Sequence, residues 1–551
     1  MSSSSTRHSP RRESRPRTTG AYRLVRTPPG SVEPPLLDAG QRAVVDHAGG
    51  PLLVLAGPGT GKTTTLVESV AARVNRGGDP ARILVLTFSR KAAVELRDRM
   101  AARLGAARGP QATTFHSYCY ALVRAHQDAD LFADPLRLLS GPEQDVTVRE
   151  LLAGQLDLEK EGLAQVRWPD ELRACLTTRG FADEVRAVLA RSRELGLGPD
   201  ALADFARRTG RPDWSAAAQF LAEYLDILDA QGVLDYAELV HRAVLLAERP
   251  EVAAELAGRY DAVYVDEYQD TDPAQVRLLH ALAGNRGRAP GYARGHGEEA
   301  RGEGGRGEGE SVRGEGARAG RTLIAFGDPD QSIYTFRGAD VNGILDFPDT
   351  FRRADGTPAP VGVLTTSRRS GSGLLAATRL LTRRMPLNRL PADTVRAHRE
   401  LHAVRDGGRV ETYTYPTAST ELENIADLLR RAHLEDGVPW QEMAVLVRAG
   451  GRSLPAVRRA LTSAGVPLEV DGDDLPLRHE PAVAPLLTAL RSVATAALRG
   501  LPEGDEDEAD GAEQGEADGA DPGETGGAEQ GEADGADPGE TGGAEQGEAD
   551  G

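Results

Sequence analysis

The sequence predicts an α/β protein with a parallel sheet that carries a phosphate-binding loop. Short apolar runs alternate with segments whose apolar residues have helical spacing, which is typical of a parallel sheet covered by helices on both faces. The first run leads directly into a glycine-rich segment that ends in Lys62 and Thr63. We expect strands at residues 52–55, 83–86, 263–265, 322–326, 361–364, 410–415 and 443–447.

The charge of the chain is distributed unevenly. Asp and Glu outnumber Lys and Arg by 84 to 65 among the 551 residues, and the formal net charge is −19. Residues 501–551 contain 19 of the acidic residues and no Lys or Arg, so the first 500 residues hold 65 of each sign. The net charge therefore does not argue against a polyanionic partner.

Cysteine content and hydropathy exclude two classes of protein. Cys119 and Cys175 are the only cysteines and form no CxxC pair, which excludes a disulfide scaffold and predicts that there is no structural metal site. The longest apolar run near a strand, residues 51–56, is far shorter than a membrane span. We therefore expect no membrane contact and a cytoplasmic location.

Composition and periodicity divide the chain into segments. The stretch rich in Gly, Arg and Glu cannot bury enough apolar surface to become ordered, and the acidic tail repeats a polar 16-residue unit that is typical of a solvated spacer. We expect a disordered basic arm at 1–36, a nucleotide-binding domain at 37–122 and 251–346 with a disordered insertion at 284–320, a helical domain at 123–250, and a low-complexity tail at 501–551. The alternative for the basic arm is an electrostatic contact with nucleic acid.

The glycine-rich segment reads "AGPGTGKT" at residues 56–63. Glycines let the backbone N–H groups turn toward phosphate oxygens, and the helix that follows adds partial positive charge at its N-terminus. Lys62 would neutralise the β- and γ-phosphates, and the hydroxyl of Thr63 would bind Mg²⁺. The alternative is an ordinary glycine-rich turn. The expected nucleotide-binding residues here are Gly57, Gly59, Thr60, Gly61, Lys62, Thr63 and Thr64.

An acidic pair supports the nucleotide site. Asp266 and Glu267 directly follow the apolar strand "AVYV". Burying two adjacent carboxylates is unfavourable unless a metal or another partner compensates them. The pair therefore fits an aspartate that binds Mg²⁺ and a glutamate that activates water. A solvated acidic turn, the alternative, does not explain the four apolar residues before the pair.

Seven segments follow one another in an order that carries a family resemblance. They read "LDAGQRAVV" at 37–45, "LTFSRKAAVELRDRM" at 86–100, "TTFHSY" at 113–118, "LDYAEL" at 234–239, "DEYQD" at 266–270, "FGDPDQSIYTFRGAD" at 326–340 and "LTTSRRS" at 364–370. This ordered set lies within residues 37–475 and resembles the motifs of UvrD/PcrA/Rep-type superfamily 1 DNA helicases. The arginine-rich sequences of these motifs are most similar to those of actinobacterial RecB-like and AdnA/AdnB-type helicase subunits.

The resemblance implies a RecA-like ATP-binding domain, called 1A in this family, with the helical segment as domain 1B and with ATP and Mg²⁺ as cofactors. It implies that Gln41 reads the adenine edge, that Gln331 senses the γ-phosphate and that Arg369 stabilises the charge developing there. Glu267 would activate water. The family has a stacking tyrosine where Arg368 stands. A guanidinium can also stack on adenine, and the alternative is a surface arginine.

The same resemblance implies contacts with single-stranded DNA through aromatic stacking and phosphate binding. The alternatives are core packing for the aromatic residues and a helix-surface charge for the lysine. The family usually carries tryptophan at position 336, so we expect weaker stacking there. The expected DNA-binding residues are Phe88, Lys91, Phe115, His116, Tyr334, Phe336 and Arg337.

The later part of the chain matches the family only partly. We expect a partial second RecA-like domain, called 2A, at 347–474 and the start of domain 2B at 475–500. No "KGLE"-like or "RLLYVALTRA"-like motif follows Arg369, which indicates a truncated helicase.

Two interpretations of function remain open. The first is an ATP-dependent helicase or translocase, 3′→5′ by resemblance, acting on single-stranded and duplex DNA in repair or recombination at the bacterial nucleoid. The second is a catalytically incomplete ATP- and DNA-binding subunit that needs a partner chain, such as a second helicase or nuclease subunit. A third option, a phosphate-loop ATPase that is not a helicase, is disfavoured by the ordered motifs.

Overall fold

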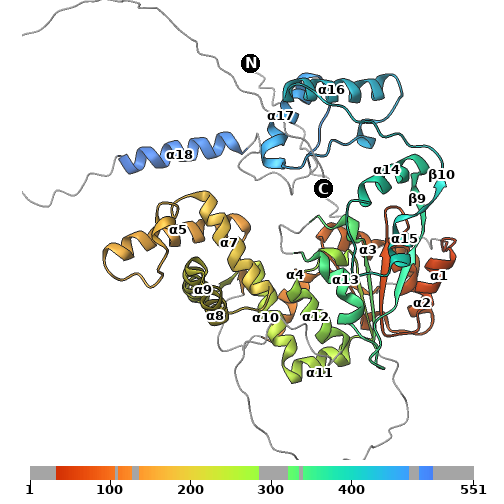
Figure 1. Cartoon of the computed structure of the whole chain (residues 1–551), viewed down its shortest axis with the longest axis horizontal. Helices are drawn as coiled ribbons and strands as arrows, with labels where there is room; N and C mark the ends of the chain where they lie inside the picture. Colours follow the sequence, from red (N-terminus) through yellow and green to blue (C-terminus); the bar gives the residue numbers. More distant parts are fainter. Residues whose placement is uncertain are drawn as a thin grey trace, which may run out of the picture. The chain divides into compact units, whose positions relative to one another are not determined.

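The structure is a computed structural model that describes residues 33–105, 109–126, 136–284, 321–333, 339–470 and 483–499. The chain divides into two compact units, one up to Glu411 and one from Thr412 (Figure 1). Nearly all of the expected basic arm, insertion and acidic tail lies outside the described residues, so these three assignments stay predictions.

A six-stranded parallel sheet forms the centre of the first unit, in the strand order β3-β2-β6-β7-β1-β8. The strands are β1 (Pro51–Ala56), β2 (Ile83–Thr87), β3 (Gln111–Thr114), β6 (Ala262–Val265), β7 (Thr322–Gly327) and β8 (Val361–Leu364). Five of them coincide with the apolar runs of the sequence, and β3 is additional. The predicted α/β class with a parallel sheet is confirmed.

Helices cover both faces of this sheet because successive side chains of a strand point to opposite sides. Val54 packs with helices α2 and α3, whereas its neighbour Leu53 packs with the helices of the other face. The first face is covered by α1 (Ala39–Val45), α2 (Lys62–Asn75) and α3 (Arg90–Leu104). The second face is covered by α4 (Phe115–Ala125), α10 (Tyr236–Glu248), α11 (Pro250–Arg259), α12 (Pro273–Ala283) and α13 (Val341–Thr350).

The helical segment has a hydrophobic core of its own, which includes the fully buried Phe220 and Leu221. It is built from α5 (Gly141–Lys160), α6 (Asp170–Arg173), α7 (Arg179–Glu194), α8 (Pro199–Thr209) and α9 (Pro212–Ala230), with the short parallel pair β4 (Arg137–Leu138) and β5 (Val233–Leu234). The expected helical domain at 123–250 extends too far, because the buried side of α10 packs against the sheet core.

The end of the sheet domain also differs from the expected boundary at residue 347. Phe347 on α13 is fully buried against Tyr268, and β8 pairs with β1 as the sixth strand. Both α13 and β8 therefore belong to the sheet domain. The chain then forms β9 (Thr366–Gly371), α14 (Ser372–Thr382), α15 (Ala392–Arg399) and β10 (His402–Arg405), with β9 and β10 paired in parallel.

The unit from Thr412 is helical in its described part. It contains α16 (Ala418–Leu434), the 3₁₀ turn η5 (Trp440–Glu442), α17 (Gly450–Ser463) and α18 (Ala484–Arg499), with a small core around Ala426 and Leu461. The strands expected at 410–415 and 443–447 are wrong: these segments form neither helix nor strand and pair with no strand among the described residues. The partial second RecA-like domain therefore stays a prediction.

No helix in the described part of the chain has the length and apolar content needed to cross a membrane.

Candidate functional site

Three neighbouring strands bring the predicted nucleotide site together. β6, β7 and β1 are adjacent and parallel, so their carboxyl ends meet at one edge of the sheet. The segments that leave this edge carry residues 57–61, 266–270 and 328–331. Ligands of open α/β sheets bind at this edge, where loops and helix N-termini converge.

The phosphate loop follows β1 and leads into α2 at Lys62. Gly59 and Gly61 have φ angles of 74° and 84°, a left-handed conformation that glycine adopts without strain. A Cβ on Gly59 would lie 2.7 Å from Cβ of Arg369, so glycine is also required by the close approach of that chain segment. The hydroxyl of Thr60 donates to the carbonyl of Gly57 at 2.8 Å and closes the loop. Thr63 and Thr64 lie in the first turn of α2 and are half-buried.

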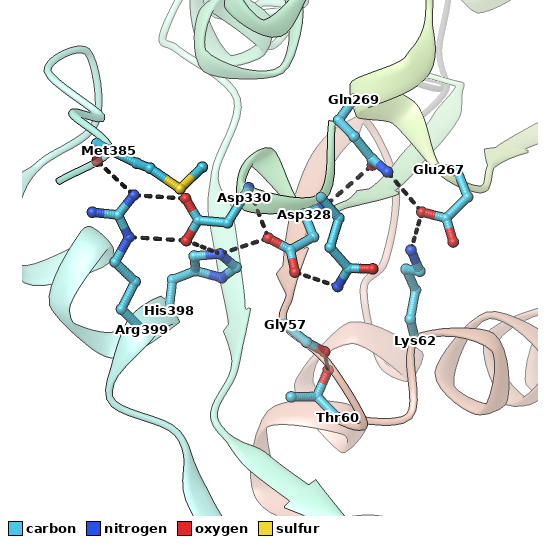
Figure 2. A network of polar contacts seen from close by, with 11 residues as sticks. Gly57, Thr60, Lys62, Glu267, Gln269, Asp328, Asp330, Met385, His398 and Arg399 are labelled. Carbon is cyan, nitrogen blue, oxygen red and sulfur yellow. Dashed lines mark hydrogen bonds and ion pairs between the residues drawn. The ribbon is translucent and has the colours of Figure 1, made fainter. Parts of the chain in front are cut away.

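Lys62 forms an ion pair with Glu267 across this edge (Figure 2). Glu267 has a φ of 53° and is the one non-glycine residue in the left-handed region within the described part of the chain. Such a conformation is unfavourable for a side chain and is retained where the surrounding structure holds it, often at a functional site. Gln269 also donates to Glu267 Oε2, at 2.8 Å. The carboxylate is thus held in front of the phosphate loop.

Asp266 is buried at the end of β6, and its Oδ1 has no hydrogen-bond partner among the described residues. Burial raises the pKa of this carboxyl to about 6, although the positive charge of Lys62 opposes the shift. The pKa of the nearby Asp270 is raised to about 7, by burial and then by the charge of Glu267. An unsatisfied buried carboxylate that interacts with the charge of Lys62 fits a divalent cation, which would offset its desolvation.

Gln41 and Arg368 both bond Asp38 beside the phosphate loop. Gln41 donates to the carbonyl of Thr60 at 3.2 Å and forms a capping box with Asp38 at the start of α1. Arg368 donates to Asp38 Oδ2 at 2.9 Å, and its backbone N–H donates to the carbonyl of Gly59. Asp38, which the sequence analysis did not single out, therefore joins the two predicted residues.

Gln331 and Arg369 approach the same edge from different elements. Gln331 ends the 3₁₀ turn η3 (Pro329–Gln331) after β7, and its Nε2 donates to Asp328 Oδ2 at 2.5 Å. Arg369 lies on β9, and its side chain is exposed. Its Cβ adjoins Gly59, so the side chain of Arg369 begins close to the phosphate loop.

The predicted DNA contacts have different environments. Phe88 follows β2 and is half-buried, whereas Lys91 is exposed on α3. His116 on α4 is half-buried and packs edge-on against Tyr236, with ring centroids 5.2 Å apart. Burial lowers the pKa of His116, and Arg90 adds to this shift.

One of these assignments needs correction. Phe115 is 2% exposed and belongs to the hydrophobic core below the sheet, so its ring offers no face to a base. Tyr334, Phe336 and Arg337 lie outside the described residues.

Sequence reasoning missed several residues of this site. Gln269 donates to Glu267 and accepts from the backbone N–H of Asp328. It therefore joins the segment 266–270 to the start of η3. His398 and Arg399 at the end of α15 bond the carboxylates of Asp328 and Asp330. The motif "DEYQD" pointed to Gln269. Nothing in the sequence pointed to His398, because its partner lies 70 residues earlier.

Comparisons with known proteins place these observations in a family. Residues 37–352 match the family of the UvrD/REP helicase N-terminal domain. Among curated relatives, ATP-dependent DNA helicase UvrD1 of Mycobacterium leprae is 28% identical over 454 residues, which cover 79% of this chain and 50% of the relative. DNA helicase II of Escherichia coli is 27% identical over 438 residues, covering 78% and 51% respectively.

A third relative, ATP-dependent DNA helicase UvrD2 of Mycobacterium bovis, is 28% identical over 463 residues, which cover 80% of this chain and 55% of the relative. The chain thus spans about half the length of the curated relatives it matches.

Proposed function

Since the chain belongs to the UvrD/REP helicase family, we propose that it is an ATP-dependent DNA helicase or translocase. Its substrates would be single-stranded and duplex DNA, its direction of movement 3′→5′, and its role DNA repair or recombination in the bacterial cytoplasm, in association with the nucleoid. The observation that carries the proposal is the pairing of Lys62 with Glu267 beside the unsatisfied Asp266.

The residues of the site divide the work of ATP hydrolysis. Lys62 and the glycine loop would bind the phosphates, while Thr63 and Asp266 would hold Mg²⁺, which supplies neutralisation of phosphate charge. Glu267 would accept a proton from the attacking water. Arg369, whose planar guanidinium suits phosphate geometry, would stabilise negative charge from the opposite side of the loop.

The DNA contacts would lie along the same edge of the sheet. Phe88 follows the carboxyl end of β2, and His116 follows that of β3, the strand next to it. Lys91 lies in the first turn of α3, the helix after Phe88. Aromatic rings and a cation at neighbouring strand ends suit a grip on single-stranded DNA that tolerates any sequence. Movement along DNA would then be driven from the adjacent ATP site.

A second candidate function is an ATP- and DNA-binding subunit that is catalytically incomplete and acts with a second helicase or nuclease subunit. The alignments cover 50% of the first relative and 51% of the second. The two candidates predict the same ATP binding but different responses to DNA.

The first experiment measures the affinity of the chain for ATP with Mg²⁺ by titration calorimetry. Lys62→Ala should abolish binding, because the loop then lacks its phosphate cation. Lys160→Ala is the matched control, since Lys160 is an exposed lysine on α5 paired only with Asp157 in the described structure. A wild-type chain that does not bind ATP with Mg²⁺ would refute both candidates.

The second experiment separates the candidates. ATP hydrolysis stimulated by single-stranded DNA, together with unwinding of a duplex with a 3′ tail but not a 5′ tail, supports the helicase. ATP and DNA binding without stimulated hydrolysis supports the incomplete subunit.

A further inference from the structure

A polar cluster outside the predicted nucleotide ligands connects α15 to the turn that carries Gln331. His398 Nε2 lies 3.0 Å from Asp328 Oδ1, and Arg399 forms two hydrogen bonds with Asp330, of 2.9 and 2.6 Å (Figure 2). The side chains of His398 and Asp328 are 2% and 1% exposed. Two residues at the end of one helix therefore clamp the two aspartates that flank Pro329.

The hydrogen-bonding chemistry fixes the tautomer of His398 and the orientation of the amide of Gln331. A carboxylate only accepts hydrogen bonds, so the proton of His398 must be on Nε2 and the amide nitrogen of Gln331 must face Asp328. Asp328 Oδ1 accepts from His398 and from the backbone N–H of Asp330, and Oδ2 accepts from Gln331. His398 thereby fixes the rotation of the carboxylate, and the carboxylate fixes the amide of Gln331.

The same three side chains resemble a cation site, since ligand atoms of Asp328, Asp330 and His398 lie within 4.8 Å of one another. Their bonding argues against a metal. Both oxygens of Asp330 already accept from the guanidinium of Arg399, whose positive charge would repel a second cation. His398 needs its Nε2 proton for Asp328 and so has no lone pair directed at the cluster.

The end of α15 also touches the phosphate loop. A Cβ on Gly57 would lie 2.9 Å from Leu401 Cδ1 and 3.6 Å from the carbonyl oxygen of His398. The segment from His398 to Leu401 thus contacts both the loop that would bind phosphates and the turn that carries Gln331. A displacement of α15 would change both.

We propose that His398 is a positioning residue that, through Asp328, orients the amide of Gln331 toward the γ-phosphate. The amide nitrogen has two hydrogens. One is used by Asp328, which leaves the other for the γ-phosphate. This inference rests on the proposed function, because it requires ATP in the loop. It assigns to α15 a role in distinguishing ATP from ADP, since ADP lacks the group that Gln331 would contact.

The test compares His398→Gln with His398→Asn in the full chain. Both amides are polar and fit a polar site, but only the longer side chain places a donor at the position of Nε2. We expect His398→Asn to weaken ATP binding roughly tenfold, the effect of losing a hydrogen bond to a charged group, with ADP affinity kept within about twofold. His398→Gln should keep the wild-type preference for ATP. Arg396→Ala, an exposed arginine on the same helix, is the control.

A double-mutant cycle gives a readout that a purely structural role would not produce. Gln331→Ala alone should lose the preference for ATP, and adding His398→Asn should lower it no further, because the two residues act in series. Equal losses of ATP and ADP affinity, or additive effects in the double variant, would overturn the inference. So would stoichiometric Zn²⁺ binding by the wild type that His398→Asn abolishes.

The same measurements keep this inference apart from the proposed function. If the wild type does not bind ATP with Mg²⁺, the proposed function fails. If ATP binds and requires Lys62, but His398→Asn keeps the full preference for ATP over ADP, only the role of His398 fails. If His398→Asn does not fold, His398→Met, which also lacks the donor, replaces it in both comparisons.

Discussion

Two aspartates at opposite ends of β6 show how one sheet separates structure from chemistry. Asp261 precedes the strand and receives two hydrogen bonds of 2.6 Å from Arg82, which lower the pKa of its carboxyl. Asp266 follows the strand, is buried, and has an oxygen without a partner among the described residues. The same residue type, five positions apart, is satisfied at one edge and unsatisfied at the other.

The difference teaches that the protein keeps unfavourable groups where a ligand would compensate them. The edge with Asp266 also holds the left-handed Glu267. Each feature destabilises the chain without ligand, and each becomes useful when phosphate and a cation are present. The opposite edge can be optimised for stability alone. Changes at the two edges should therefore separate activity from stability.

The largest expected effect is on Glu267. Glu267→Gln keeps the shape of the side chain but removes its basicity, so hydrolysis should fall about 10²–10⁴-fold. ATP binding should persist, because the phosphate loop is unchanged. Single-turnover hydrolysis of ATP by the wild type and the variant tests this. Hydrolysis at the wild-type rate would show that the edge holding Glu267 is not the reactive one.

The next effect concerns acid stability. His280, in the last turn of α12, is stacked on Phe351 with its ring nitrogens unpartnered in the described structure, and burial lowers its pKa to about 4. As pH falls below the unfolded value near 6.5, the unfolded state takes up a proton that the folded state refuses, so stability is lost. His280→Phe should reduce that loss by about 2 kcal/mol at pH 5.

Urea unfolding of the wild type and His280→Phe at pH 7.5 and pH 5 measures this difference. His241, whose pKa burial also lowers to about 4, remains in both proteins, so part of the acid sensitivity should persist. Equal pH dependence in the two proteins would contradict the burial argument, while ATP affinity should not change in either case.

Asp266→Asn should act on cation-assisted binding. The loss of a metal ligand should lower ATP affinity in Mg²⁺ by at least about tenfold, whereas affinity measured in a chelator should stay the same. Stability should not decrease, because Asp266 Oδ1 has no hydrogen bond to lose within the described structure. An equal decrease with and without Mg²⁺ would exclude Asp266 as the cation ligand.

Asp261→Asn is the matched change at the other edge and should have the smallest effect. Its ion pair with Arg82 is largely exposed, so the free energy of unfolding should fall by at most about 1 kcal/mol. ATP affinity should be unchanged with and without Mg²⁺. A loss of ATP affinity here would mean that the two edges are coupled, contrary to the comparison.

The sequence predicts the positions of the strands better than the boundaries of the sheet domain. Five apolar runs locate strands because buried parallel strands are continuously apolar. The run at β8 does not reveal which sheet it joins, since it pairs with β1, whose residues lie 308 positions earlier in the chain. β3 escapes prediction because only Ala112 and Thr114 among its four residues are buried. The apolar face of α10 likewise does not specify which of two cores it enters.

The site follows the same division. The chemistry of Lys62 and Asp266 follows from the local motifs in which they lie, whereas Gln331 is implied by the family resemblance. The structure brings the three segments to one edge of the sheet. The clamp of His398 on Asp328 is a contact between distant segments, and a single histidine in a polar helix carries no signal. Which predicted aromatic residues are exposed also depends on packing, as the burial of Phe115 illustrates.

Gly284 and Arg321, the described residues at the two ends of the insertion expected at 284–320, lie close together. A Cβ on Gly284 would lie 2.2 Å from a guanidinium nitrogen of Arg321, and both residues line a cavity with Pro51, where β1 begins. Gly284 and Arg321 therefore lie at the amino end of the strands, whereas Lys62 lies at the carboxyl end. A fluorescent reporter whose own termini are adjacent could be grafted between these two residues, and it would leave the edge that holds Lys62 unobstructed.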